Sequence, residues 1–83
     1  MIEVILPVLD EAAAIPDVLS GLPAGFAPIV VDNGSTDGSA DVARAHGARV
    51  VSEPRRGFGA ACQAGLESAE TEVVCMMDCD GSL

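Results

Sequence analysis

Four short apolar runs, separated by stretches of helical character, limit the folds open to this sequence more than any other feature. Each run is rich in β-branched or other apolar residues and is bounded by Gly, Pro, Asp or Glu. Runs of this length and composition are typical of buried strands. We therefore expect strands at residues 4–6, 29–31, 48–51 and 73–77.

The stretches between these runs predict helices. Pro16 suits a first helical turn, and Gly47 suits the position just after a helix end. Thr36 or Asp37 can cap the start of the second helix. We expect helices at residues 16–19, 38–46 and 57–69.

This alternation predicts an α/β fold, with a parallel sheet of about four strands joined by three crossover helices. Right-handed crossovers give the strand order three-two-one-four, with two helices on one face and the third on the other. The fourth strand then lies at an edge, apolar on both sides and uncovered. Because an unpaired apolar edge is a template for another chain, we expect self-association through it.

The charge of the chain excludes some partners. Thirteen Asp and Glu residues stand against four Arg, which gives a formal net charge of −9. Nucleic acids and anionic membrane surfaces bind clustered cations, so neither is an expected partner. An anionic ligand would need a metal ion or backbone amides as an intermediary.

The cysteines and the apolar runs bear on location. The number of cysteines is odd, which indicates a reducing compartment. We expect Cys62, Cys75 and Cys79 to be buried as small hydrophobic residues. No apolar run approaches the ~18 residues of a membrane span. We therefore expect a soluble, cytoplasmic chain.

Acidic and glycine-rich segments follow each predicted strand, at the sheet edge where α/β folds bind ligands. Asp78 and Asp80, after the fourth strand, are spaced to hold one divalent cation, Mg²⁺ or Mn²⁺. A polar turn is the alternative for this pair. Asp32, at the end of the second strand, can accept hydrogen bonds from the N–H edge of uracil or guanine, or it can cap the following helix.

A candidate phosphate site follows the third strand. Arg55 and Arg56 precede Gly57-x-Gly59 at a predicted helix N-terminus, where backbone amides and a guanidinium can hold a phosphate. Two solvated arginines are the alternative. The third glycine of the dinucleotide-binding pattern G-x-G-x-x-G is missing, which argues against that class.

Four motifs together resemble the family 2 glycosyltransferases, and within them the dolichyl- or polyprenyl-phosphate sugar synthases. They are Val4-Ile5-Leu6-Pro7-x-x-Asp10-Glu11, Ile29-Val30-Val31-Asp32-Asn33-Gly34-Ser35-Thr36-Asp37-Gly38-Ser39, Arg56-Gly57-x-Gly59-Ala60-Ala61 and Asp78-x-Asp80-Gly81. The resemblance spans the chain. It implies a Rossmann-like fold, the N-terminal half of a nucleotide-diphospho-sugar transferase fold.

The resemblance also implies a donor site for a UDP- or GDP-linked sugar, and an acceptor such as a polyprenyl phosphate. By position, Pro7, Leu9 and Glu11 would border the base and ribose, and Asp32 would receive the base edge. Asp78 and Asp80 would hold the ribose, the diphosphate and the metal. The remaining donor-site residues implied are Gly34, Arg56 and Gly57. The full-length enzyme would lie in the cytoplasm, at the inner face of the membrane.

The sequence departs from the family pattern at several positions. The usual aromatic after the first proline is Leu9, the usual Asn before Glu11 is Asp10, and the usual Lys of the R-G-K-G loop is Phe58. The family's acceptor half and catalytic base follow the D-x-D motif. We therefore expect residues 1–83 to be the donor-binding portion alone, with no catalytic residue and no sugar transfer by itself.

Two other hypotheses remain open from the sequence. Residues 74–82 also resemble the nucleophile strand of haloacid-dehalogenase-like phosphatases, with Asp78 as the nucleophile. That motif opens its own domain, however, whereas it lies at the end of these 83 residues. The other hypothesis is a non-catalytic fragment that binds a nucleotide.

Overall fold

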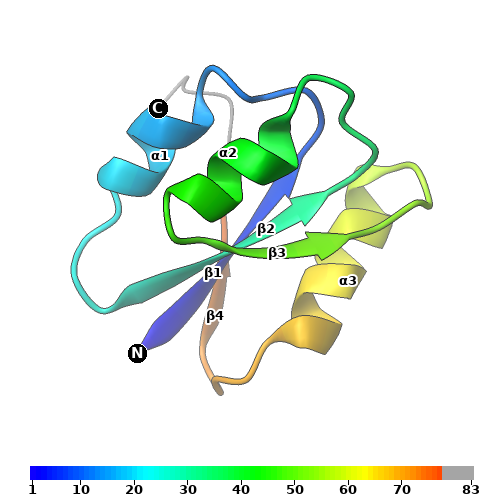
Figure 1. The fold of residues 1–83 in the computed structure, drawn as a ribbon. Helices are drawn as coiled ribbons and strands as arrows, with labels where there is room; N and C mark the ends of the chain where they lie inside the picture. The colour runs from blue at the N-terminus through cyan, green and yellow to red at the C-terminus, as the bar shows by residue number, and fades with distance from the viewer. Residues whose placement is uncertain (78–83) are drawn as a thin grey trace.

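A computed structural model of the chain describes residues 1–77. Within them a single parallel sheet has the order β3-β2-β1-β4, which confirms the predicted topology (Figure 1). The strands are β1 (Ile2–Val8), β2 (Phe26–Asp32), β3 (Arg49–Ser52) and β4 (Val74–Met76). The helices are α1 (Ile15–Ser20), α2 (Ser39–Ala45) and α3 (Phe58–Ser68).

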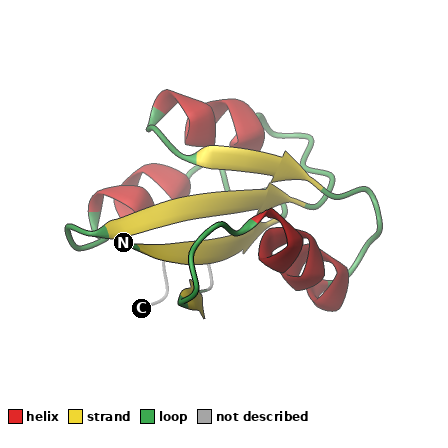
Figure 2. Ribbon diagram, turned by 90° about the horizontal axis from the view of Figure 1, so that it is seen from below, coloured by secondary structure: helices red, strands yellow, loops and turns green. Residues whose placement is uncertain are grey.

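The helices cover the sheet as the crossover rule predicts (Figure 2). On one face, α1 and α2 contribute Ile15 and Ala43 to a core with Val4, Leu6 and Val30. On the other face, α3 contributes Ala61 to a second core whose buried strand residues are Ile5, Ile29 and Val31. Alternate residues of β1 and β2 thus enter opposite cores, because successive side chains of a strand point to opposite faces.

Close packing on the second face depends on a glycine. A Cβ at Gly65 of α3 would lie 2.5 Å from Cγ2 of Ile5, which is closer than real Cβ atoms approach. The absent side chain therefore lets α3 rest directly on β1. This contact fixes the position of the helix, and with it the loop that precedes the helix.

The element boundaries differ from the predicted ones in informative ways. β1 is longer than expected because Ile2 and Glu3 pair with the start of β2. β4 is shorter, and Cys75 is exposed, which contradicts the expectation of a buried cysteine. The N-cap of α2 is Gly38, not Thr36 or Asp37, although Asp37 Oδ1 accepts a hydrogen bond from the Ser39 N–H at 3.0 Å.

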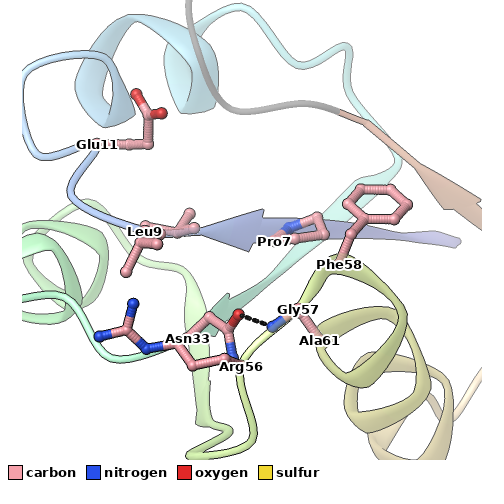
Figure 3. A pocket seen from close by; sticks show the side chains of 9 residues that line it. Pro7, Leu9, Glu11, Asn33, Arg56, Gly57, Phe58 and Ala61 are labelled. Atoms are coloured by element: carbon pink, nitrogen blue, oxygen red, sulfur yellow. Dashed lines mark hydrogen bonds between the residues drawn. The ribbon is translucent and has the colours of Figure 1, made fainter.

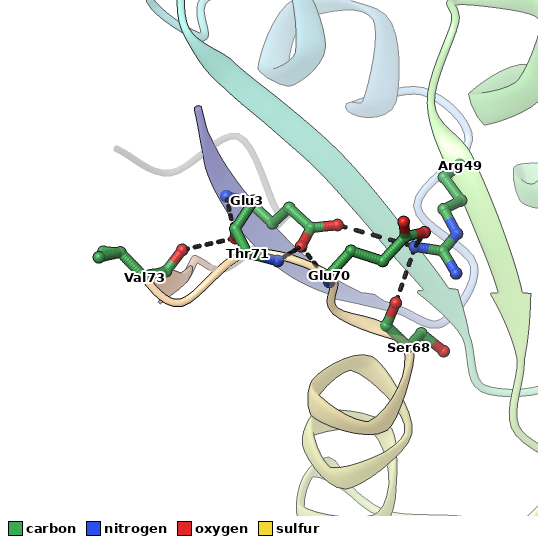
Figure 4. A network of polar contacts seen from close by, with 6 residues as sticks. All are labelled: Glu3, Arg49, Ser68, Glu70, Thr71 and Val73. Carbon is green, nitrogen blue, oxygen red and sulfur yellow. Dashed lines mark hydrogen bonds and ion pairs between the residues drawn. The ribbon is translucent and has the colours of Figure 1, made fainter.

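A polar network closes the amino end of the sheet (Figure 4). The buried Glu3 carboxylate accepts hydrogen bonds through Oε1 from the backbone N–H groups of Glu70 and Thr71, the latter at 2.7 Å. Arg49 Nη1 lies 3.7 Å from Glu3 Oε2 and donates to the Ser68 carbonyl at 2.7 Å. These bonds, above all those from the two N–H groups, hold the pKa of Glu3 below its ordinary value of 4.5.

No helix within residues 1–77 has both the length and the apolar character needed to cross a bilayer.

Candidate functional site

An open pocket of about 440 Å³ lies at the carboxyl edge of the sheet, a size common for small-molecule sites. Its walls come from the end of β1 and the segment after it, from the residue after β2, and from the loop before α3 with the first turn of that helix. The lining residues are Pro7, Val8, Leu9, Glu11, Asn33, Arg56, Gly57, Phe58 and Ala61 (Figure 3). The pocket thus lies at the edge of the sheet that the sequence indicated.

The pocket brings together five of the residues that the resemblance implied for the donor site. They are Pro7, Leu9, Glu11, Arg56 and Gly57. The Glu11 carboxylate accepts no hydrogen bond from the described residues, although the Glu11 N–H donates to Ser39 Oγ at 3.0 Å. The backbone of this pocket residue is thus fixed, while its carboxylate is available to a ligand.

Asp32 and Gly34 lie beside the pocket and do not line it. Asp32 is the last residue of β2, and its Oδ1 accepts a hydrogen bond from the Ser35 N–H at 3.0 Å. Gly34 has φ +100, a conformation that side chains disfavour, and a Cβ there would lie 3.8 Å from Arg56 Nε. Asp32 therefore shapes the turn that brings Gly34 close to Arg56.

Asn33 is a functional candidate that the sequence reasoning missed. Its buried amide donates to the carbonyls of Glu53 at 2.9 Å and Arg55 at 2.7 Å, and its Oδ1 accepts from the Gly57 N–H at 3.0 Å. An amide carries both donors and an acceptor, so one side chain ties down the whole loop before α3. The signal available in the sequence was an Asn directly after a buried strand.

The structure separates two arginines that the sequence treated as a pair. Arg55 donates to Glu53 Oε1 from Nη2 at 2.7 Å and from Nε at 3.1 Å. This hydrogen-bonded pair raises the pKa of Arg55 and lowers the pKa of Glu53 from its ordinary value. Arg56 lines the pocket and forms no ion pair with a described residue. Arg56 is therefore the guanidinium available to an anionic ligand.

The loops after β1 and β2 are bonded to each other. Asp10 adopts a left-handed conformation with φ 55, which Asp and Asn tolerate better than most residues. Its Oδ1 accepts from the Thr36 N–H at 2.8 Å, and its own N–H donates to Ser35 Oγ at 2.9 Å. Asp37 Oδ2 accepts from the Ala12 N–H at 3.1 Å. Asp10, where the family has Asn, thus helps to join the two loops beside the pocket.

The charge of Asp37 is also stabilised at this junction. Asp37 accepts a short hydrogen bond from the Ser39 hydroxyl in addition to the N–H of Ala12. These bonds, the hydroxyl first, lower the pKa of Asp37 from its ordinary value of 3.8. Asp37 therefore serves to join the loops as a carboxylate.

The start of α3 is suited to an anion. Its N-cap, Gly57, makes no side-chain cap, and the first turn carries no acidic residue. The amide groups at a helix start attract negative charge, and Arg56 directly precedes this start. Among the described residues, the pocket therefore offers one guanidinium, and the start of α3 offers amides without a side-chain cap.

The expected metal ligands cannot be placed at the pocket. Asp78 and Asp80 lie outside the described residues. Within residues 1–77, no group of three or more His, Cys, Asp or Glu side chains is arranged to hold a metal ion. Divalent metal binding by Asp78 and Asp80 therefore stays a prediction from the sequence.

Comparison with known proteins identifies the family. The family model described as glycosyl transferase family 2 matches residues 3–83. The chain belongs to this family. The resemblance stated from the four motifs is thus confirmed, and the family assignment decides against the haloacid-dehalogenase-like alternative.

Relatives of this family 2 chain are found in bacteria and archaea. An uncharacterized glycosyltransferase of Mycobacterium tuberculosis is 50% identical over 82 residues, which is 99% of this chain and 38% of the relative. A dolichyl-phosphate hexose transferase of Haloferax volcanii is 34% identical over 80 residues, 93% of this chain and 35% of the relative. The chain therefore spans little more than a third of these curated relatives.

Solved structures show the same fold. Glucosyl-3-phosphoglycerate synthase from Mycobacterium tuberculosis, in complex with Mn²⁺, UDP and glucosyl-3-phosphoglycerate, matches with a TM-score of 0.82 and 37% identity. Mannosyl-3-phosphoglycerate synthase from Rubrobacter xylanophilus matches with a TM-score of 0.88 and 27% identity. The matches cover 95% and 96% of this chain, and 33% and 30% of those chains. The predicted nucleotide-diphospho-sugar transferase fold is thereby confirmed.

Proposed function

We propose that this chain is the donor-binding portion of a glycosyltransferase, and that its pocket binds a UDP- or GDP-linked sugar. The supporting observation is that five implied donor-site residues line one pocket, three from the end of β1 and the segment after it and two from the loop before α3. The related synthase that was solved with Mn²⁺ and UDP supports the same ligand class.

Each side of the pocket has a distinct role in this proposal. Pro7 and Leu9 border the base and ribose, and Glu11 accepts hydrogen bonds from the ribose hydroxyls. Asp32, whose Oδ2 accepts no hydrogen bond from a described residue, receives the N–H edge of the base. Arg56 and the amides at the start of α3 hold the phosphates, because charge-assisted hydrogen bonds to phosphate are strong.

The divalent metal, Mg²⁺ or Mn²⁺, would be held by Asp78 and Asp80. Carboxylate oxygens are the ligands that these hard cations prefer, and the cations commonly share them with substrate phosphates. When bound, the metal neutralises charge on the leaving diphosphate. In a protein with a net charge of −9, it also offsets repulsion between the donor and the acidic side chains.

Sugar transfer requires an acceptor and a base that deprotonates the acceptor. We place this base outside the donor-binding portion of the enzyme. We infer that the 83 residues alone bind the donor without transferring the sugar. A polyprenyl phosphate is the proposed acceptor of the whole enzyme. The dolichyl-phosphate hexose transferase relative supports this class, and a lipid acceptor would place the enzyme in the cytoplasm at the inner membrane face.

Calorimetry with UDP and GDP, with and without Mn²⁺, tests this proposal. We expect metal-dependent binding that Asp80→Ala abolishes. Arg56→Ala should weaken binding about tenfold, the loss of about 1.4 kcal/mol from one charged contact, while Arg44→Ala should not. Arg44 is the matched control because it pairs with Asp41 on α2, outside the pocket. Equal binding with the metal chelated would exclude the proposed role of Asp78 and Asp80.

We also propose that β4 mediates self-association of this chain. β4 pairs only with β1 among the described strands, and Val73 and Met76 at this edge are exposed. An unpaired edge with apolar side chains favours pairing with a second chain. Sedimentation velocity at micromolar concentration should show a dimer or larger species. A monomer at these concentrations would refute this proposal.

A further inference from the structure

Phe58 lines the pocket, and packing against the hydrophobic core does not explain its position. It is the first residue of α3, its side chain is 62% exposed, and it lines the pocket with Pro7 and Leu9. Neither hydrophobic core includes it. The other phenylalanine, Phe26, packs against the core at the start of β2. Packing therefore accounts for Phe26 but leaves the ring of Phe58 available to a ligand.

The apolar part of the pocket otherwise consists of aliphatic groups. Figure 3 shows the Phe58 ring on the side of Pro7, with the Glu11 carboxylate toward the other side. Leu9 is 41% exposed and supplies no π-surface where the family usually has an aromatic residue. Among the residues that line the pocket, Phe58 is the aromatic one. A flat, uncharged group of a ligand in this pocket could therefore stack only on the ring at the start of α3, among the lining residues.

We propose that Phe58 provides the aromatic surface on which the nucleobase of the donor stacks. This inference rests on the proposed function, because it names the group that the pocket's aromatic residue recognises. Stacking of a base on an aromatic side chain is tolerant of base identity. The contact would therefore strengthen UDP and GDP binding alike, while Asp32 distinguishes bases by their N–H groups.

The same residue replaces a cation in the family pattern. With Phe58 at that position, Arg56 is the charged side chain that lines the phosphate side of the pocket. The two contributions respond differently to salt, because ions screen a charged contact and leave stacking largely unaffected. The loss of affinity caused by Phe58→Ala should therefore be the same at low and high salt, whereas the loss caused by Arg56→Ala should shrink.

Proton NMR offers a direct test, because the whole chain contains two Phe, one His and no Trp or Tyr. The chain is titrated with UDP, and separately with GDP, in the presence of Mg²⁺. We expect the Phe58 ring protons to shift and to show nuclear Overhauser effects to the base protons. Phe26, at the amino end of β2, is the internal control and should not shift.

Binding measurements on matched variants complete the test. Phe58→Ala should weaken UDP binding by roughly 5- to 150-fold, the range for loss of one base–aromatic stack, and Phe58→Tyr should retain the affinity. Leu66→Ala is the control, since Leu66 is an exposed apolar residue of the same helix outside the pocket.

Four outcomes would overturn the inference. Wild-type affinity in Phe58→Ala, or UDP binding without a change in the Phe58 ring signals, would exclude stacking while the proposed function stands. An equal Phe58 shift with pyrophosphate alone would show that the ring responds to the phosphate end. No binding of either nucleotide would refute the proposed function, and the inference with it.

Discussion

Carboxylates lie at both ends of the sheet, and the two ends use them differently. At the amino end, Glu3 is buried and accepts hydrogen bonds from the N–H groups of Glu70 and Thr71. At the carboxyl end, Glu11 lines the pocket, and no described residue donates a hydrogen bond to its carboxylate. One acid thus completes the fold, whereas the other is available to a ligand.

The difference shows how acidic residues in loops can be sorted by their partners. A buried carboxylate whose oxygens are occupied by backbone N–H groups stabilises a connection, because removing it would leave those groups unsatisfied. A carboxylate held in a pocket by its backbone alone contributes little to the fold. Asp37 is exposed and lies at the carboxyl end, yet it resembles the first kind because its oxygens accept hydrogen bonds from the N–H groups of Ala12 and Ser39.

Asn33→Ala should have the largest effect, because Asn33 supports the fold at the carboxyl end of the sheet, where the pocket lies. Both stability and ligand binding should therefore decrease. The substitution leaves the carbonyls of Glu53 and Arg55 and the Gly57 N–H without their partner. We expect a loss of about 1–3 kcal/mol in the free energy of unfolding, measured by urea denaturation, together with weaker UDP binding. Gln63→Ala removes an exposed amide from α3 and should change stability by less than about 0.5 kcal/mol.

Glu3→Ala tests the structural role of the amino end. The variant should unfold several degrees below the wild type in a thermal melt followed by circular dichroism, since two backbone N–H groups lose their acceptor. Its folded fraction should bind UDP with unchanged affinity, because the pocket lies at the opposite end. Glu72→Ala, an exposed acid in the same connection, is the control. An equal decrease in both variants would contradict a specific role for Glu3.

Helix α3 allows a second comparison, because one of its glycines, Gly65, packs against β1 and another, Gly59, meets no neighbouring atom. Gly65→Ala should destabilise the chain by about 1–3 kcal/mol, because its Cβ would meet Ile5 at 2.5 Å. Gly59→Ala meets no atom within 4 Å and should be neutral or stabilising by up to about 1 kcal/mol, the difference in helix propensity. Chemical denaturation of both variants gives the two values. A stabilising Gly65→Ala would show that α3 can move away from β1.

The pH dependence of stability should show the smallest effect, and it tests the carboxylates that accept hydrogen bonds within the fold. Lowered pKa values of Glu3, Asp37 and Glu53 mean that the unfolded chain binds protons more readily than the folded chain. Their stabilisation is complete above the ordinary values, 4.5 for Glu and 3.8 for Asp. It is lost as the pH falls through the lower folded-state values.

Melting temperatures measured from neutral pH down to about pH 3 test this dependence. The melting temperature should fall in acid for the wild type. Glu3→Gln should be less stable at neutral pH and lose less in acid, because one of the titrating groups is gone. An identical acid dependence in both proteins would refute the assignment of Glu3.

The fold was predictable from the sequence because it follows from two properties, the local composition of the strands and the handedness of the connections between them. The apolar runs placed β1 and β2, and the handedness of crossovers gave the strand order and the helix faces. The position of the pocket followed from the carboxyl ends of the strands. The ends of β1 and β4 were not predictable, because pairing with neighbouring strands sets them.

The details of the site depended on contacts between distant segments. Asn33 gains its role from a loop that lies 20 to 24 residues away in sequence, which no local pattern shows. Arg55 and Arg56 are adjacent in sequence, yet only the folded loop pairs Arg55 with Glu53 and leaves Arg56 at the pocket. Phe58 was read as a missing cation, whereas the structure places it as an aromatic wall of the pocket.

The central position of β1 also has a consequence for how the chain folds. β1 pairs on one side with β2, but its other side pairs with β4, where Glu3 lies opposite Val74. β1, the first strand in the sequence, therefore keeps an open edge until almost all of the described chain has been made. Contacts between residues so far apart in sequence form slowly, and an open strand edge promotes aggregation meanwhile. Refolding yield should therefore fall as protein concentration rises, because chains aggregate during the stage in which β4 is still unpaired.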